Sequence, residues 1–369
     1  MLACRASGNG LFTTSLGGLM FLDKDYMRMF DVNNQHDGGR HGEQPATSRG
    51  RGRGRRPIAG ARVSGYAVRR VAALLPLLVG ISVLVFLVIH LVPGDPVAAI
   101  LGTSDNNPAL VARLHQQLGL NLPLPAQYLH WVKGVVTGNF GYSYSQQIAV
   151  SSLLVTNLGD TAQLTVAALG FSLVFGTLVG VVAARRRNTV TDAVGMGVAL
   201  IFLSMPSFWL GLIIILVFAV QLHWLPVVGG VSFSGLILPA LTLGLASMGF
   251  IARFVRSSVI EAGDQPHVII ARAKGLRRWT VLRRHVLRNS VLAVLPVIGL
   301  ELGNLLSGAV IVETVFSRPG LGRLLVTAIL SKDYPTVQAV VLLIAVIYAV
   351  LNLVVDLLYP VLDPRLRHG

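Results

Sequence analysis

Six long apolar runs, separated by polar loops, constrain the fold of this chain more than any other feature. The runs cover about residues 71–92, 162–184, 193–222, 235–254, 291–312 and 336–359. A helix needs about 20 apolar residues to cross the ~30 Å hydrocarbon core of a bilayer, and each run reaches that length. Only 13% of the 369 residues are charged, roughly half the fraction found in an ordinary soluble domain. The sequence therefore predicts an all-α, polytopic membrane protein with six transmembrane helices.

The third run is too long for one straight span. As a single helix, 193–222 would reach about 43 Å at ~1.5 Å per residue. Pro206, flanked by Ser204 and Ser207, interrupts it, and a broken backbone is tolerated in a membrane where it is buried or lines a cavity. We therefore expect a kinked third span.

The positive charge is unevenly distributed. The net charge of +15 comes mainly from the N-terminal tail and from short loops such as 185–187 and 266–288, whereas 95–160 holds only Arg113 and Lys133 as basic residues. Basic loops stay on the cytoplasmic side of a membrane. The pattern predicts a multi-pass protein of the inner or plasma membrane with both termini cytoplasmic. The basic run at 51–56 lacks the aromatic support that nucleic-acid binding needs, so we expect no nucleic-acid partner.

Three parts follow from these patterns. We expect residues 1–60 to be a disordered cytoplasmic tail, 61–160 to hold the first span and an extracytoplasmic segment, and 161–369 to form the transmembrane core. Asp160 or Thr161 is the expected cap of the second span. The extracytoplasmic segment is predicted to contain two small amphipathic helices. Their apolar positions are Leu110, Val111, Leu114 and Leu118, then Tyr128, Trp131, Val132 and Val135.

The loop 266–288 is predicted to be structured. Nothing breaks a helix between His267 and Lys274, and Gly275 stands where a helix C-terminus favours glycine. Val268, Ile269, Ala271 and Arg272 recur at the spacing of a helical face. Two interpretations fit this short helix equally well: a docking knob for a soluble partner, or an amphipathic helix resting on acidic lipid headgroups.

Motifs for catalysis are missing. None of the lysines belongs to a GxxxxGK[ST] loop, so the chain cannot be an ATPase of that kind. The histidines show no metal-ligand spacing, no GxSxG motif surrounds Ser204, and the single cysteine, Cys4, rules out an internal disulfide. We expect no enzyme activity and no metal or other cofactor in this chain.

Several polar groups interrupt the apolar runs. Glu301 and Asn304 are three residues apart and so share one helical face. A carboxylate in a membrane span is costly enough to suggest a polar path, although buried polar side chains also join helices to one another. The residues we assign to a candidate translocation path are Ser204, Ser207, Glu301, Asn304 and Asn352.

Several sequence blocks, in order along 66–367, resemble one known family. They include LVPGDP at 91–96, SMPSFWLGL at 204–212, ARAKGL at 271–276, ETVFSRPGLGRLL at 313–325 and the closing LVVDLLYPVLDPRLR. These blocks are similar to those of the permease subunits of peptide-class ABC importers, which move dipeptides, oligopeptides and, in some members, nickel or glutathione.

The resemblance implies that the helix at about 265–275 is a coupling helix, which docks on a separate ATP-hydrolysing subunit. The implied coupling residues are Gln265, His267, Val268, Ile269, Ala271, Arg272, Lys274, Gly275 and Leu276. The wider superfamily has an EAA triplet three residues before the glycine. Here Ile269, Ile270 and Ala271 occupy those positions, so the acidic residue is absent.

The implied function is half of a translocation path for di- or oligopeptides. The implied partners are a second permease subunit, two ATP-binding subunits that hold ATP and Mg²⁺, an extracytoplasmic substrate-binding protein, the peptide and membrane lipid. Import of nickel or glutathione by the same architecture stays open. So do a proton-coupled secondary transporter that uses Glu301 and a membrane scaffold without transport.

Overall fold

The computed structural model describes residues 59–91, 108–117, 121–227, 230 and 232–362, and the chain from Ile58 onward forms one compact unit. The predicted tail lies almost entirely outside the described residues, and so does LVPGDP after Leu91.

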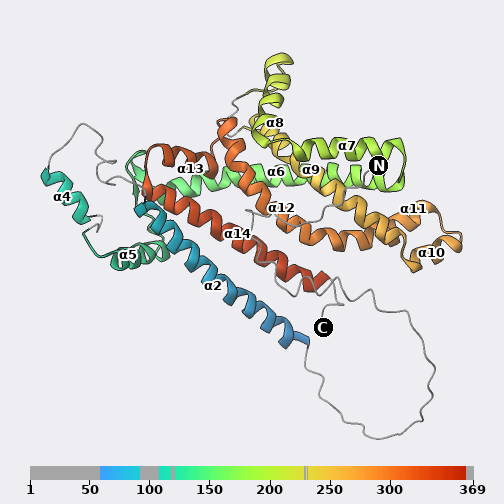
Figure 1. Ribbon diagram of the computed structural model, residues 1–369, viewed down its shortest axis with the longest axis horizontal. Helices are drawn as coiled ribbons and strands as arrows, with labels where there is room; N and C mark the ends of the chain where they lie inside the picture. Colours follow the sequence, from blue (N-terminus) through green and yellow to red (C-terminus); the bar gives the residue numbers. More distant parts are fainter. Residues whose placement is uncertain (1–58, 92–107, 118–120, 228–229, 231, 363–369) are drawn as a thin grey trace, which may run out of the picture. The chain divides into compact units, whose positions relative to one another are not determined.

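Long apolar helices dominate the described residues (Figure 1). Five are long and apolar enough to cross a membrane on their own. They are α2 (Ala59–Leu91), α6 (Val150–Arg185), α9 (Phe233–Gly263), α12 (Leu287–Val315) and α14 (Tyr334–Leu362). The pair α7 (Val190–Ser204) and α8 (Ser207–Ile214), with the π-helical continuation η2 (Ile215–Gln221), passes the same test together. The all-α architecture with up to six spans is thus confirmed.

The predicted break at Pro206 is confirmed, and it is larger than a kink. The two helices on either side of it are bent by 107°. Pro206 is extended, with ψ of 134°, and precedes the first residue of α8. Proline cannot donate a backbone hydrogen bond inside a helix, whereas its fixed φ suits a helix start. The third run therefore forms two helices that point in different directions.

Shorter elements connect the spans. They are α4 (Pro108–Gln117), α5 (Leu124–Val136), the antiparallel strands β1 (Tyr142–Ser143) and β2 (Ile148–Ala149), α10 (Pro266–Ala273), α11 (Arg278–Val281), the π-helical η3 (Leu282–Val286) and α13 (Leu321–Leu330). Helices α4 and α5 confirm the two predicted amphipathic helices. The strand pair was not predicted, because two residues per strand leave no periodic signal.

One boundary prediction is wrong. Asp160 and Thr161 do not cap the second span, because α6 begins at Val150 and buries both residues in its interior. No proline interrupts 150–160, so the helix extends through it. After the fifth apolar run, α12 continues to Val315, and the RPGLGR segment at 318–323 leads into helix α13.

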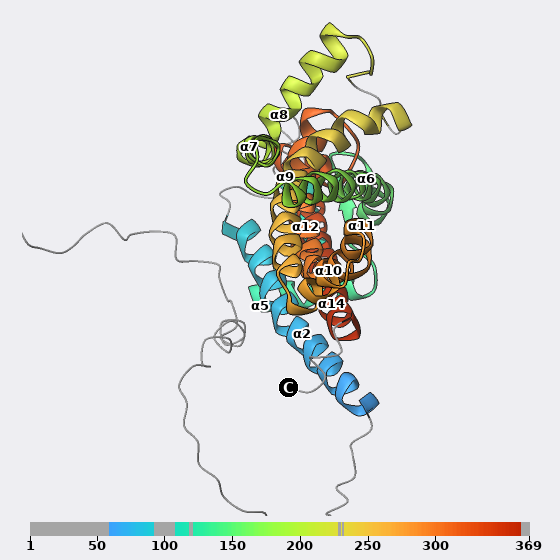
Figure 2. The same ribbon diagram turned by 90° about the vertical axis from the view of Figure 1, so that its right-hand side faces the viewer.

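Helices α6 and α9 run side by side in the same direction at the centre of the bundle (Figures 1 and 2). Small residues allow this close approach. A Cβ on Gly176 would lie 2.9 Å from the Ile251 side chain, and one on Gly180 would lie 2.5 Å from the Ala252 carbonyl oxygen. This order places Gly180 level with Ala252 and the C-termini of both helices at the same end.

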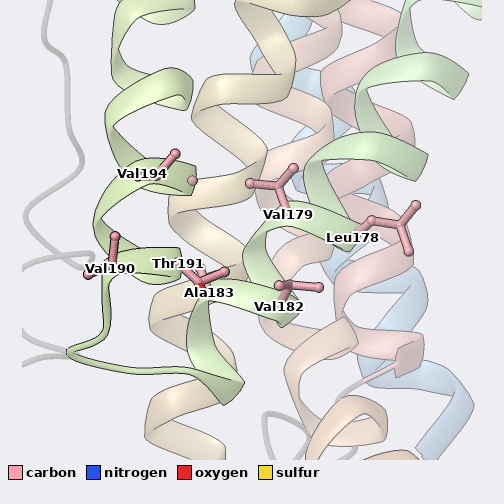
Figure 3. Close-up of a pocket in the computed structure, with 8 residues that line it drawn as sticks. Leu178, Val179, Val182, Ala183, Val190, Thr191 and Val194 are labelled. Atoms are coloured by element: carbon pink, nitrogen blue, oxygen red, sulfur yellow. The ribbon is translucent and has the colours of Figure 1, made fainter.

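We call the end where α6 and α9 finish the basic end, since it carries Arg185–Arg187 and the loop that follows α9. The opposite end holds β1, β2, α13 and the start of α6. Between α6 and α7, near the basic end, lies an apolar groove of about 560 Å³, with Leu178, Val179 and Val182 on one side and Val190 and Val194 on the other (Figure 3). In a membrane such an apolar groove costs nothing to expose to lipid.

Candidate functional site

The structure places a short helix after α9 at the basic end, as predicted. Helix α10 begins with Pro266 at its first position, where a missing N–H is harmless. It ends with Gly275 at φ +77°. The Gly275 N–H donates to the Arg272 carbonyl oxygen at 3.0 Å and the Leu276 N–H to that of Ala271 at 3.4 Å. This pair of bonds is the Schellman arrangement, so the predicted glycine stop is confirmed.

The predicted single apolar face of α10 is wrong, because the structure divides it in two. Val268 is fully buried and Ala271 nearly so, against Val255 and Val259 of α9 and Val281 and Val286 before α12. Ile269 and Ile270 point outward, each 55% exposed, and Leu276 is exposed as well. Val268, Ile269 and Ile270 are consecutive and cannot share one side of a helix with 3.6 residues per turn. Val268 is therefore buried, while the two isoleucines beside it are exposed.

A basic rim surrounds the outward apolar positions. The other predicted coupling residues are all exposed: Gln265, His267, Arg272, Lys274 and Gly275. Arg277 and Arg278 follow on the same exposed segment. We define Ile269, Ile270 and Leu276 as the outward patch. The arrangement offers a partner an apolar contact bordered by positive charge.

The depth of α10 follows from the alignment of α6 and α9. Gly180 is level with Ala252 and Val255, so Arg185, the first charge after the α6 apolar run, is level with about Ser258. Helix α9 then continues for five more residues, about 8 Å at 1.5 Å per residue, to Gly263. A headgroup layer is roughly 5–8 Å thick on each side. Helix α10 therefore begins about 8 Å beyond the level of Arg185, a distance similar to the thickness of that layer.

The candidate path residues are only partly brought together. The Asn304 side-chain amide donates to the Glu301 carboxylate at 3.3 Å, and Glu301 is only 3% exposed. Side chains of Tyr348 and Val355 lie against Gly303 and Gly299, so Asn352, half-buried between them on α14, is at the depth of Glu301. Ser204 and Ser207 flank the 107° bend, and within the described residues neither forms a hydrogen bond with this group.

Sequence reasoning missed a buried polar network at the opposite end. The Glu313 carboxylate accepts hydrogen bonds from Thr161 Oγ1 at 2.6 Å, Gly322 N at 2.8 Å and Arg323 N at 3.3 Å. Thr161 Oγ1 in turn accepts from Leu321 N at 2.8 Å. The first backbone N–H groups of α13 have no acceptor inside the helix. A carboxylate that accepts hydrogen bonds from them is therefore favourable. The network therefore fastens the start of α13 to α6.

Arg318 extends this network. Its side chain is almost fully buried and donates to the Gly230 carbonyl oxygen at 2.9 Å and to Gln163 Oε1 at 3.4 Å. Gly320 leaves no room for a Cβ, because the Glu313 carboxylate occupies that space. The signal in the sequence was the spacing of one acid, one arginine and two glycines within 313–322.

Comparison with known proteins identifies the family. The family described as the binding-protein-dependent transport system inner membrane component matches residues 176–368, and its N-terminal membrane component matches residues 64–165. The chain belongs to this family of inner-membrane transport components. It is the permease subunit of an ABC importer, a multi-pass inner-membrane protein without catalytic activity of its own.

Curated relatives agree with this family. The glutathione transport system permease protein GsiC of Salmonella choleraesuis (strain SC-B67) is 41% identical over 303 residues, which are 82% of this chain and 99% of the relative. GsiC of Escherichia coli (strain K12) is 40% identical over the same lengths. Membership implies a partner permease, ATPase subunits and a binding protein, and it decides against the proton-coupled secondary transporter.

Solved structures share the fold. Two inward-facing crystal structures of the MetNI methionine ABC transporter align with TM-scores of 0.50 and 0.51 at 20% and 19% identity. Each alignment covers 57% of this chain and 96% of the matched chain. At this identity the likeness concerns the fold alone.

Proposed function

We propose that this permease forms half of the translocation path for small peptides, with its basic end in the cytoplasm, and that α10 couples the path to a separate ATPase subunit. The observation that carries the coupling role is the division of α10 into a buried anchor and an outward patch, beyond the level at which the α6 apolar run ends. ATP and Mg²⁺ bind to the partner subunits, and this chain contributes no cofactor site.

The anchor makes α10 a lever. Val268 and Ala271 belong to one apolar cluster with Ile251 of α9 and Val294 of α12. Such a core is close-packed and transmits displacement instead of absorbing it. A push on α10 from a closing ATPase therefore moves α9 and α12, which are neighbours in the bundle. Rigid-body movement of this kind is how alternating access opens and closes a path.

The outward patch defines the partner surface. Isoleucines occupy the positions where the superfamily has an acidic residue and an alanine, so docking here depends on apolar burial. Arg272, Lys274 and Arg277 border the patch. The complementary surface on the ATPase is an apolar groove with an acidic rim, since interfaces match opposite charges at their edges.

The test is Ile270→Asp, with Ile329→Asp as the matched control at the opposite end, where Ile329 is equally exposed. Both variants should fold, because both side chains are largely exposed. Ile270→Asp should lose about tenfold or more of the ATPase subunits that purify with the permease, whereas Ile329→Asp should keep them. Undiminished co-purification with Ile270→Asp would contradict the coupling role.

The substrate class rests on the resemblance and on the relatives. Di- and oligopeptides are the proposed cargo, and the GsiC relatives make glutathione, itself a tripeptide, the second candidate. Glu301 favours a substrate with a free, positively charged amino group. Pairing with a cation lowers the free-energy cost of burying a carboxylate in the membrane. Competition between a dipeptide and glutathione for uptake by the full transporter separates the two candidates.

Glu301→Gln tests the role of this carboxylate. Uptake of peptides with a free N-terminus should fall by about tenfold or more, whereas uptake of N-acetylated peptides should change little, since a hydrogen bond to a charged group is worth about 1.5–3 kcal/mol. Initial uptake rates of the two peptide sets are compared in the same vesicles. Equal losses for both would remove Glu301 from substrate recognition.

A further inference from the structure

A second surface at the basic end has chemistry different from the outward patch. Trp279, Thr280, Arg283, Arg284 and Arg288 line a shallow groove of about 520 Å³. Trp279 is 59% exposed, and the three arginines are exposed as well. Three neighbouring positive charges repel one another, and they lie beside the exposed Trp279 ring. This surface therefore favours an anionic ligand.

No protein carboxylate neutralises these arginines within the described residues. The ion pairs found at the basic end involve other arginines: Arg256 binds Asp192 at 2.6 Å, and Arg187 lies 3.6 Å from Asp264. None of the ion pairs among the described residues includes Arg283, Arg284 or Arg288. Their charge is therefore available to a ligand.

The groove lies at the depth of the lipid headgroups. Arg288 comes three residues before the apolar run that starts at Val291, so it is about 4.5 Å from the hydrocarbon along the helix. At the other side of the groove the Arg185 guanidinium lies 5.8 Å from the centre of the Trp279 ring. Arg185 marks the end of the α6 apolar run. Two independent spans thus place the groove at the same membrane boundary.

Both residue types are typical of such a boundary. Tryptophan is enriched at membrane interfaces because its ring is amphipathic, and basic pockets beside transmembrane helices bind anionic headgroups. The outward patch, in contrast, belongs to α10, which begins about 8 Å past Arg185. The groove is therefore closer to the bilayer than the surface proposed for the ATPase.

We propose that this groove binds the phosphate headgroup of an anionic phospholipid. Arg284 and Arg288, one turn apart, contact the phosphate oxygens, and Trp279 packs its ring against the glycerol region. Because the bound lipid holds the segment that joins α10 to α12, it fixes the base of the lever that transmits the push from α10.

The experiment uses the complete transporter in vesicles of phosphatidylcholine with or without 30 mol% brominated phosphatidylglycerol, at about physiological salt. Trp131, Trp209 and Trp224 are changed to phenylalanine, which leaves Trp279 as the only fluorescent tryptophan of this chain, and partner tryptophans are replaced likewise. Brominated phosphatidylcholine at the same fraction is the lipid control. Quenching of Trp279 then reports which lipid occupies the groove.

The matched variants are Arg284→Gln/Arg288→Gln in the groove and Arg187→Gln/Arg253→Gln outside it, two exposed arginines at the same end. Brominated phosphatidylglycerol should quench Trp279 more than brominated phosphatidylcholine does. The groove variant should lower apparent affinity for phosphatidylglycerol about 30-fold, because Arg284 and Arg288 line the groove and each arginine that contacts the headgroup adds roughly a factor of five. The control variant should change it by less than about threefold.

Three results would overturn the proposal. One is equal quenching by both lipids. Another is the same loss of affinity in both variants, which would indicate general surface charge and no defined site. The third is Trp279 quenching that appears only when the ATPase subunits are removed, which would show that protein covers the groove in the assembled transporter.

Discussion

Helices α10 and α13, at the two ends of this bundle, are fastened in different ways. At the basic end α10 is anchored by apolar side chains, chiefly Val268 and Ala271. At the opposite end α13 is fastened by the buried carboxylate of Glu313, which accepts three hydrogen bonds. Ser143 and Ser145 donate to Asp333 there as well and join β1 to the start of α14.

The difference matches what each end has to do in the proposed mechanism. Apolar packing has no preferred direction, so an anchored helix can shift as a body with its neighbours. A buried hydrogen-bond network is directional, and a small displacement leaves its groups unpaired at high cost. The comparison therefore assigns movement to α10 and rigidity to the start of α13.

The largest effect should come from breaking the apolar anchor. Val268→Asp places a charge in a fully buried site and should lower the free energy of unfolding by about 4 kcal/mol. Ile269→Asp, one residue away and exposed, should change it by about 0.5 kcal/mol or less. Unfolding of the detergent-solubilised permease by increasing SDS measures both. Equal destabilisation by the two variants would contradict the division of α10.

Disrupting the hydrogen bonds to Glu313 should have the second-largest effect on stability. Glu313→Gln keeps the side-chain volume but turns an amide NH₂ toward groups that donate hydrogen bonds to the carboxylate. The free energy of unfolding should therefore fall by about 3 kcal/mol. Glu261→Gln, an exposed carboxylate near the end of α9, is the control and should have little effect. The same SDS titration applies. A change of less than about 1 kcal/mol for Glu313→Gln would show that the network is not structural.

Gly275, the glycine that ends α10, should give a smaller effect on stability and a clear one on coupling. Nothing lies within 4 Å of a Cβ at Gly275, so substitution there acts only through the backbone at φ +77°. Gly275→Val should cost about 1–2 kcal/mol and raise the ATP hydrolysed per peptide transported, whereas Gly275→Asn, which tolerates this conformation, should change less. Wild-type coupling ratios in both variants would show that the backbone at Gly275 plays no part in coupling.

The smallest effect should come from the exposed ion pair at the basic end. Arg187 and Asp264 are 3.6 Å apart and both more than half exposed. Asp264→Asn should change the free energy of unfolding by about 0.5 kcal/mol or less. Asp192→Asn should cost more, because Asp192 is buried and accepts two hydrogen bonds from Arg256. A larger loss of stability for Asp264→Asn than for Asp192→Asn would show that solvent exposure does not determine how much each ion pair contributes.

The sequence predicted the spans and the short helix α10 well, because both rest on local signals. The length of an apolar run predicts a membrane-spanning helix. Pro206 predicts the bend in the third run, and Gly275 predicts the end of α10. The boundaries were less predictable. Helix α6 extends to Val150 because its first turns pack against α13 and α14, and such contacts leave no trace in hydropathy.

The residues that were missed are those whose partners are distant in sequence. Thr161 looked like a helix cap, whereas it bonds to Glu313, which is 152 positions away. The division of α10 between Val268 and Ile269 depends on where α9 and η3 pack, which no period of the sequence reveals. Whether Glu301, Asn304 and Asn352 contact cargo stays a prediction.

Site-specific photo-crosslinking in the assembled transporter tests the central claim most directly. A photoreactive amino acid replaces either Ile270 in the outward patch or Ile329 on α13 at the opposite end, two exposed positions of the same residue type. Illumination should yield an adduct with the ATPase subunit from position 270 and none from position 329. An ATPase adduct from position 329, or only lipid adducts from position 270, would contradict the account.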